Sequence, residues 1–267
     1  MSQTTRRIKN RRVAKKKLSE LMDQPEYTVV IHYSCESFYD RPDGSSPRIT
    51  SIAVYNLGSC QTNSFSIHQK AEIKKYSSND IEKHYEELEK IMLNDFYDFV
   101  KIHEKYNWIH WNMRDINYGF QAIAHRYKVL GGNPREIDDS NRVDLSRLLT
   151  DIYGDNYISH PRLQKLMEKN DITHRDFLAG AEEADAFKNK DYVKLHQSTL
   201  RKVNLIAKIA ERAENGSLKT NARWKDIYGG YPEAIGEFLK ENWLISLLSF
   251  ISAILGIVGI VIQFLPK

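Results

Sequence analysis

Apolar and polar residues alternate in the first third of the chain, and this alternation is typical of β-strands. Three such runs, rich in β-branched and aromatic residues, occupy residues 28–34, 48–56 and 61–68. A polar loop separates the first run from the second, and a short turn at Gly58 separates the second from the third. Consecutive strands with short connections pair antiparallel, so we expect an antiparallel start to a sheet.

The spacing of apolar residues then changes to the three- and four-residue steps of a helix. Residues 81–106 keep this spacing and predict one long amphipathic helix. Residues 108–112 form a short apolar run that predicts a fourth strand, and residues 114–129 return to helical spacing before two glycines. A fifth strand is expected at residues 142–145, and further helices are expected to begin near Ser146, Pro161, Asp176 and Tyr192.

This order of elements predicts an α/β domain over residues 26–216, with helices on both faces of a mixed sheet. We expect the first three strands of this sheet to be antiparallel and the later strands to be parallel. Residues 1–25 precede the domain as a basic arm or helix. Residues 217–242 follow it as a polar linker and a juxtamembrane helix. No internal repeat is visible in the chain.

The longest uncharged stretch is residues 243–265, which contain no charged side chain over 23 positions. As a helix this stretch extends roughly 34 Å, and the hydrocarbon core of a bilayer is about 30 Å thick. We therefore expect a single-pass, tail-anchored membrane protein. Its folded domain is expected in the cytoplasm, because no apolar signal peptide precedes it. A long buried helix of a soluble protein is the alternative interpretation.

Small side chains recur within this stretch and share one helical face: Ser246, Ser249, Ser252, Ala253, Gly256 and Gly259. Small faces allow transmembrane helices to approach one another closely, so one interpretation is self-association of the chain. The alternative is a face without a partner, because glycine and serine are frequent in membrane spans.

Charge is unevenly distributed along the chain. Residues 1–17 carry eight basic and no acidic side chains, whereas the remaining residues carry 31 basic and 35 acidic ones. The basic segment is suited to an anionic membrane surface or to nucleic-acid phosphates, and a solvated arm without a partner is the alternative. The two cysteines, Cys35 and Cys60, are too few for a disulfide framework and fit a reducing compartment.

Several enzyme classes lack their usual sequence signals in this chain. It contains no phosphate-binding glycine-rich loop, no Gly-x-Ser-x-Gly motif and no His-Glu-x-x-His motif. Nucleotide hydrolysis by a P-loop, serine esterase chemistry and zinc proteolysis therefore find no support in the sequence.

Acidic residues occur at three places that the predicted topology brings to one edge of the sheet. Glu36 follows the first strand, Asp115 follows the fourth strand, and Asp185 lies on a late helix directly before Ala186. In their order and positions these acids resemble the DEDD-type 3′–5′ exonucleases, which have an RNase H-like fold, over residues 27–200. The resemblance implies magnesium or manganese bound by Glu36, Asp115 and Asp185, and a metal-dependent 3′–5′ exonuclease activity.

Three further residues are expected close to these acids. Asn112 precedes Asp115 much as an Asn precedes the Asp of the family's second motif, although the spacing is one residue short. His32 and Ser34 lie on the same side of the first strand as Glu36, because side chains alternate across a strand. We assign Ser34, Asn112 and His32 to substrate binding. Core packing is the alternative role of His32.

The chain departs from the family's pattern at two positions. Ser34 stands where the family has an Asp that bridges two metal ions, and Gly180 stands where the family has a His or Tyr, for which His174 is the nearest titratable replacement. Divalent cations require anionic oxygen ligands, so we expect reduced or lost nuclease activity. Each acid also has a structural explanation, either as a solvated side chain or, for Asp115, as an acid near a helix N-terminus.

Two functions of different classes follow from the sequence. The first is a membrane-anchored, exonuclease-like protein that binds nucleic acid or a nucleotide, with nuclease activity reduced or lost, in a role such as bacterial defence or stress. The second is a catalytically inactive sensor or scaffold whose transmembrane helix oligomerises and perturbs the membrane. A third hypothesis is that the whole chain is a structural tether for a cytosolic partner. The expected partners are the lipid bilayer, nucleic acid or a nucleotide, and further copies of the chain.

Overall fold

The computed structural model describes residues 3–37, 46–173 and 175–228, and beyond them only residue 235, residues 247–248 and residues 251–255. The described strands are β1 (Thr28–Cys35), β2 (Ile49–Asn56), β3 (Thr62–Ser66), β4 (Asn107–His110) and β5 (Arg142–Asp144). The described α-helices are α1 (Gln3–Asp23), α2 (Ile67–Ile73), α3 (Tyr85–His103), α4 (Phe120–Val129), α5 (Leu145–Tyr153), α6 (Arg162–Lys169), α7 (Gly180–Lys188), α8 (Tyr192–Glu214) and α9 (Trp224–Tyr228).

The strands form a five-stranded mixed sheet in the order β3-β2-β1-β4-β5. β1 pairs antiparallel with β2, and β2 pairs antiparallel with β3. The pairs β1 with β4 and β4 with β5 are parallel. The predicted antiparallel start and parallel continuation are confirmed, and this mixed sheet with flanking helices fits an RNase H-like fold.

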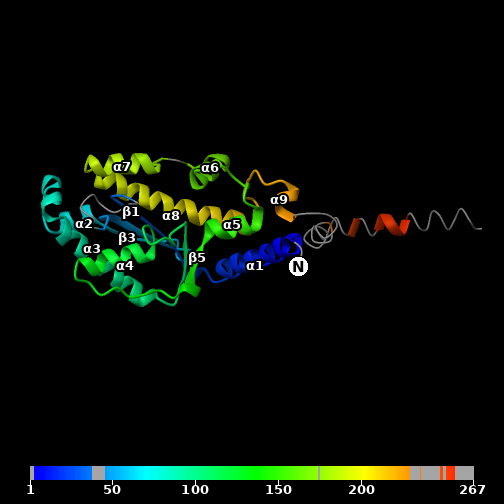
Figure 1. The fold of residues 1–267 in the computed structure, drawn as a ribbon, viewed down its shortest axis with the longest axis horizontal. Coiled ribbons are helices and arrows are strands. Elements are labelled where there is room, and N and C mark those ends of the chain that lie inside the picture. Colours follow the sequence, from blue (N-terminus) through cyan, green and yellow to red (C-terminus); the bar gives the residue numbers. More distant parts are fainter. Residues whose placement is uncertain are drawn as a thin grey trace, which may run out of the picture.

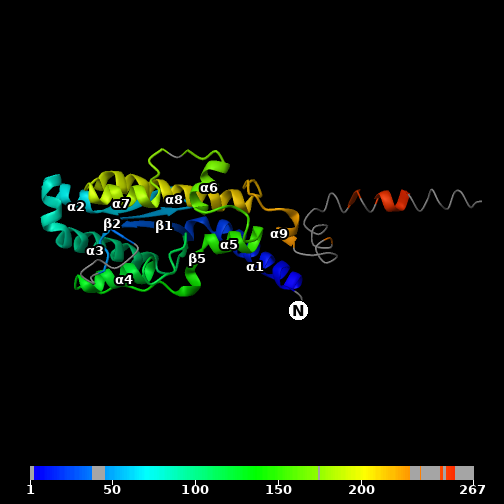
Figure 2. The ribbon, with the colours of Figure 1, turned by 45° about the horizontal axis from the view of Figure 1, so that its top comes forward.

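Helices cover both faces of the sheet (Figures 1 and 2). Figure 2 shows α8 and α7 on one side of the strands and α3 and α4 on the other. β1 lies in the centre of the sheet, and the seven residues from Thr28 to Ser34 are all buried. A strand covered on both faces needs an almost continuous apolar sequence, which explains the unbroken Val-Val-Ile run at its start.

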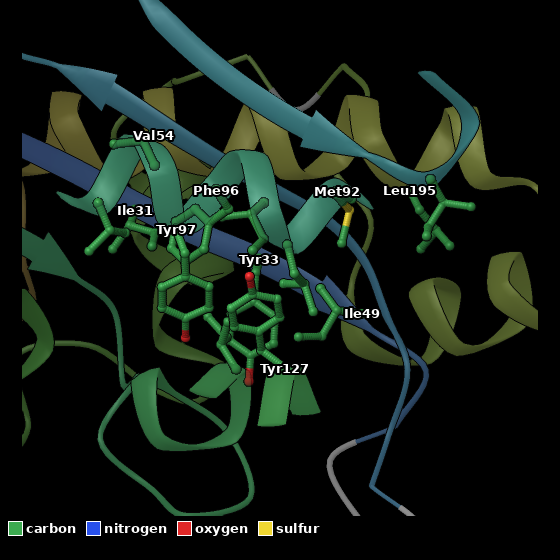
Figure 3. Close-up of a cluster of buried hydrophobic side chains, with 14 of the residues drawn as sticks. Ile31, Tyr33, Ile49, Val54, Met92, Phe96, Tyr97, Tyr127 and Leu195 are labelled. Atoms are coloured by element: carbon green, nitrogen blue, oxygen red, sulfur yellow. The ribbon is translucent and has the colours of Figure 1, made fainter. Parts of the chain in front are cut away.

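Two groups of buried side chains pack against the opposite faces of the sheet. One group combines Ile31 and Tyr33 of β1 with Met92 and Phe96 of α3 (Figure 3). The other combines Val30 of β1 with residues of α1, α5 and α8. β1 contributes to both groups because successive side chains of a strand point to opposite faces.

Several predicted boundaries differ from the structure. The helix expected at residues 81–106 is α3, from Tyr85 to His103, and the helix expected near Asp176 is α7, which begins at Gly180. The third strand was expected to reach residue 68, but it ends at Ser66 and α2 begins at once. The helix expected from residue 114 begins only at Phe120, because a bridge between Arg114 and Gly119 closes a turn ahead of it. A Cβ atom at Gly119 would lie 2.4 Å from the carbonyl oxygen of Met113, so this turn requires glycine.

The basic N-terminal segment is a helix that packs on the domain. Ala14, Leu18 and Leu21 of α1 are buried in the same group of side chains as α5 and α8. The guanidinium of Arg11 lies 5.0 Å from the ring centroid of Tyr228 in α9. These contacts hold α1 against the domain, so the interpretation as a solvated arm does not apply to residues 6–23.

The predicted transmembrane segment lies largely outside the described residues, which include only residues 247–248 and 251–255 of it. Among the residues that the structure does describe, no helix has the length and apolar character needed to cross a membrane. The juxtamembrane helix expected before residue 243 also lies outside the described residues, apart from residue 235.

A buried ion pair connects α3, α4 and the start of β2. The Nη2 atom of Arg126 lies 2.7 Å from Oε2 of Glu89, and its Nε atom lies 3.0 Å from Oε1. The Arg126 side chain is 2% exposed and the Glu89 side chain is 0% exposed. Oε1 of Glu89 also accepts the backbone N–H of Ile49 at 2.7 Å, so the pair fixes both helices to the sheet.

Replacing Arg126 by alanine is expected to lower the free energy of unfolding by about 3–5 kcal/mol, because Glu89 would stay buried without its cation. The matched control is Arg135→Ala, which removes an exposed ion pair with Glu104 and is expected to change the free energy by less than about 1 kcal/mol. Urea denaturation of the two purified variants measures both changes. Equal effects of the two substitutions would contradict the assignment.

Candidate functional site

A cavity of about 500 Å³ lies at the carboxyl ends of β1 and β4. Its walls come from β1, from residues 111–118 after β4, from residues 161–164 around the start of α6, and from α7 and α8. In open α/β sheets, ligands bind outside the carboxyl ends of the parallel strands. We therefore take this cavity as the candidate functional site.

The structure brings only some of the predicted site residues together. His32, Asn112 and Asp115 line the cavity. Glu36 and Asp185 are not among the residues that line it. The site therefore combines predicted residues with residues that the sequence analysis did not select.

A buried ion pair in the cavity wall is the main feature that the sequence analysis missed. The Nζ atom of Lys202 in α8 lies 2.7 Å from Oε1 of Glu183 in α7. Lys202 is 6% exposed and Glu183 is 8% exposed. The hydroxyls of Ser34 and Ser198 each donate a hydrogen bond to the same carboxylate oxygen at 3.1 Å. The ammonium and the two hydroxyls together neutralise and solvate the Glu183 carboxylate.

Ser34 belongs to a chain of hydroxyl groups between the sheet and α8. Its Oγ atom lies 2.8 Å from Oγ1 of Thr199, which in turn lies 2.6 Å from Oγ of Ser51 in β2. Ser34 and Ser51 are also paired across the β1–β2 ladder. Ser34 is thus a neutral, hydrogen-bonded side chain that joins β1 to α7 and α8.

Helical geometry explains why Glu183, rather than Asp185, faces the cavity. Two residues of a helix that are two positions apart lie about 200° apart around its axis, so they cannot face the same side. Glu183 shares its face with the buried Ala186, whereas Asp185 is exposed. The apolar Ala186 three residues after Glu183 is a sequence signal that Glu183 lies on the buried face of α7. The sequence analysis selected Asp185 instead, because Asp185-Ala186 is similar to the motif of the exonuclease family. His174, the other residue considered for this motif, lies outside the described residues.

Glu36 is held at the end of β1 by the neighbouring strand. Its backbone N–H donates to the carbonyl oxygen of Arg48 at 2.8 Å, and its Oε2 atom accepts the backbone N–H of Arg48 at 3.3 Å. The pairing register of β1 shifts between Ser34 and Cys35. A shift of register re-aims the side chains that follow it, so strand alternation cannot be extended to Glu36.

Asp115 and Asn112 lie in the exposed loop between β4 and α4. Oδ1 of Asp115 accepts the backbone N–H of Asn117 at 2.9 Å, which is a local turn contact. Asn112 has a positive φ angle of 55°, and its backbone N–H donates to Oδ1 of Asp144 at 3.3 Å. Asp144 also caps the start of α5, so this carboxylate fixes the loop that forms one wall of the cavity.

The residues present do not fit the magnesium or manganese centre that the resemblance implied. Within the described ranges, no three His, Cys, Asp or Glu side chains lie close enough together to hold a metal ion. Glu36, Asp115 and Asp185 are all described, and they do not form such a group. Glu183 is already paired with Lys202. Hard divalent cations need several anionic oxygen ligands, and this cavity does not offer such a set.

His32 lines the cavity and has one buried ring nitrogen without a hydrogen-bond partner among the described residues. Burial, and secondarily the charge of Lys202, holds the pKa of His32 well below its usual value, so the ring is neutral at pH 7. The Tyr118 hydroxyl donates to the Tyr33 carbonyl at 3.2 Å and lies 3.3 Å from Nδ1 of His32. Because the single hydroxyl proton is directed to the carbonyl, we assign the ring proton of His32 to Nδ1, which leaves a lone pair on Nε2. Nε2 is buried and has no hydrogen-bond partner among the described residues.

Aromatic side chains form much of the remaining wall. Trp111, Tyr118 and Phe177 all line the cavity. Tyr118 stacks on Tyr33 with a centroid distance of 4.6 Å, which fixes the plane of its ring. The Lys202 ammonium lies 5.3 Å from the centroid of the Phe177 ring, a cation–π contact that adds to its pairing with Glu183. The cavity therefore offers flat apolar surfaces beside a small number of polar atoms.

Replacing Lys202 by methionine is expected to lower the free energy of unfolding by about 3 kcal/mol, because Glu183 would be left buried without its cation. The double variant Lys202→Met/Glu183→Gln removes both charges and is expected to recover most of this loss. Lys208→Met, an exposed lysine of the same helix, is the matched control and is expected to act within about 0.5 kcal/mol. Urea denaturation tests the set, and a double variant no more stable than Lys202→Met would argue against the pairing.

Comparisons with known proteins add little to this picture. No protein-family model and no curated protein matches the chain. The structure is similar to that of the family B DNA polymerase from the hyperthermophilic archaeon Pyrobaculum calidifontis, with 13% sequence identity and a TM-score of 0.48. The similarity covers 69% of this chain and 24% of the polymerase chain, so the chain spans about a quarter of the polymerase. At this identity and score, the similarity does not indicate a shared function.

Proposed function

We propose that the domain binds a nucleotide in the cavity at the carboxyl ends of β1 and β4 and holds it without cutting it. The nucleotide is either free or the end of a single nucleic-acid strand. The observation that carries this proposal is the buried, unpartnered Nε2 atom of His32 in an aromatic-lined cavity.

The size and walls of the cavity favour a ligand with a flat ring. Its volume of about 500 Å³ lies within the range of roughly 300–1,000 Å³ of small-molecule sites. Trp111, Tyr118 and Phe177 supply the apolar surfaces on which a nucleobase stacks. Base stacking of this kind tolerates different bases, because every base has a π-face.

The polar atoms of the cavity favour a ligand that donates a hydrogen bond. A buried acceptor without a partner is costly, and a ligand N–H or O–H group directed at Nε2 of His32 removes that cost. Exocyclic amino groups of nucleobases and sugar hydroxyls are donors of this kind. Asn112 and Asn117, both exposed at the cavity, supply further amide groups to a bound nucleotide.

The ion pair between Lys202 and Glu183 favours binding of a nucleotide without its cleavage. The Glu183 carboxylate lies in the cavity wall, but its Oε1 atom is occupied by Lys202 and two hydroxyls. The remaining acid of the cavity, Asp115, is exposed and takes part in a local turn. This arrangement lacks the converging acids that position and activate a hydrolytic water through metal ions.

The full-length chain, purified in a mild non-ionic detergent, is expected to bind adenosine monophosphate in isothermal titration calorimetry. His32→Leu is expected to weaken binding about ten-fold, because the donor of the ligand would lose its buried acceptor. His125→Leu, an exposed histidine of α4, is the matched control and is expected to leave the affinity unchanged. Binding is also expected to stay constant from pH 8 to pH 6.5, because the pKa of His32 lies well below its usual value.

Two results would contradict this proposal. One is an affinity that falls equally in His32→Leu and His125→Leu, or in neither variant. The other is degradation of a labelled DNA or RNA strand in magnesium or manganese that disappears in Glu183→Gln or Asp115→Asn. Degradation that persists in both of these variants would come from another protein in the preparation.

Membrane attachment forms the second part of the proposal, and its support comes from the sequence of residues 243–265. After cell fractionation, the full-length chain is expected in the membrane pellet and to be released by detergent but not by high salt. A chain that ends at residue 228 is expected in the soluble fraction. A full-length chain in the soluble fraction would contradict membrane attachment.

The alternative, a membrane effector, depends on clustering of the small-residue face within the same segment. It requires growth arrest by the full-length chain that is lost when Gly256 and Gly259 are replaced by leucine. Growth arrest that persists in this variant would argue against clustering.

A further inference from the structure

A second cavity, of about 530 Å³, lies where α1, the start of α5 and the edge strand β5 meet. These three elements lie beside one another in both views of the ribbon (Figures 1 and 2). Four basic and two acidic side chains line this cavity: Lys17, Arg114, Arg142, Arg147, Asp139 and Asp144. The second cavity is therefore rich in positive charge, whereas Lys202 is the only basic residue lining the first among those that the structure describes.

The charges of the second cavity do not cancel. Nη1 of Arg114 lies 3.1 Å from Oδ2 of Asp144, and Nη1 of Arg142 lies 2.8 Å from Oδ1 of Asp139. Lys17 and Arg147 form no hydrogen bond or ion pair within the part of the chain that the structure describes. Arg147 interacts electrostatically with Asp151, which does not line the cavity. The charged side chains that do line the cavity carry two more positive than negative charges, which favours an anionic ligand.

Arg142 is held in position for such a ligand. Its guanidinium lies 5.1 Å from the ring centroid of Phe120, and its Nη2 atom donates to the carbonyl oxygen of Ile137. Its Nε atom is buried without a hydrogen-bond partner among the described residues. The partner acid, Asp139, is 92% exposed in its side chain, and exposed ion pairs are worth only about 0–1 kcal/mol. A phosphate group can therefore replace Asp139 and use the planar fork of the guanidinium.

The two cavities share one short segment of the chain. Asn112 and Asp115 line the first cavity, while Met113 and Arg114, which lie between them in sequence, line the second. Consecutive Cα atoms are about 3.8 Å apart, so these four residues extend over at most about 11 Å. A flexible polymer can therefore contact both cavities across this segment.

We propose that the second cavity binds backbone phosphates of a single nucleic-acid strand whose terminal nucleotide occupies the first cavity. This inference rests on the proposed function and deepens it by naming a polymer, rather than a free nucleotide, as the ligand. It also gives α1 a role: its packing on α5 and α8 places Lys17 at the second cavity. An anionic lipid surface would offer the same phosphate chemistry to α1, so the experiment includes it.

The experiment compares the full-length chain with Lys17→Gln, Arg147→Gln and the double variant. The probes are a labelled single strand of about ten nucleotides, adenosine monophosphate, and vesicles with and without phosphatidylserine. Each substitution is expected to weaken strand binding and to lower the slope of log affinity against log salt by about 0.7, hence by about 1.4 in the double variant. Binding of adenosine monophosphate is expected to stay unchanged.

Lys9→Gln is the matched control, because Lys9 is an exposed cation of the same helix that does not line the second cavity. Arg147→Lys keeps the charge and is expected to retain most of the salt slope, which separates loss of charge from misfolding.

The inference is overturned if Lys9→Gln weakens strand binding as much as Lys17→Gln, or if the double variant binds the strand like the parent. It is also overturned if the double variant loses binding to phosphatidylserine vesicles but keeps strand binding. Failure of the parent to bind adenosine monophosphate would instead contradict the proposed function of the first cavity.

Discussion

The buried ammonium of Lys202 determines the chemistry of the cavity at the carboxyl ends of β1 and β4. A carboxylate with the low exposure of Glu183 is stable only when it is paired, and Lys202 supplies that pairing at 2.7 Å. The same ammonium adds to the effect of burial in lowering the pKa of His32, which keeps this ring neutral. The charges of Lys202 and Glu183 thereby cancel in the cavity wall, beside a neutral His32 whose Nε2 atom has no hydrogen-bond partner among the described residues.

The rest of the fold supports this arrangement by positioning α8. The helix packs on the central strands, and the chain of hydroxyls from Ser51 through Thr199 to Ser34 fixes its register against them. α1 packs on α5 and α8, and so brings a cation of the basic N-terminal segment to the second cavity. The loop after β4, held by Asp144, separates the two cavities. A binding surface that extends across this loop suits a strand better than it suits a small metabolite.

The order and direction of the strands could be predicted because alternation and short connections are local properties of the sequence. The first three strands and the parallel fourth and fifth strands were confirmed, apart from the early end of β3. The site was predicted less well. His32 and Asn112 line the cavity, whereas Asp185 is exposed on α7 and is not among the lining residues. Similarity to a short motif does not specify which face of α7 is buried. Glu36 follows a shift of register that alternation alone cannot reveal.

The sequence by itself determined the α/β class, the mixed sheet, the concentration of positive charge near the N-terminus and the long uncharged stretch at residues 243–265. Each of these follows from residues that are neighbours along the chain or recur at a fixed period. Only the tertiary structure decided that Lys202 pairs with Glu183, that Ser34 bonds to both α7 and α8, and that Lys17 and Arg147 line the same cavity. These contacts join residues far apart in the sequence, and their energies depend on burial, which no local pattern specifies.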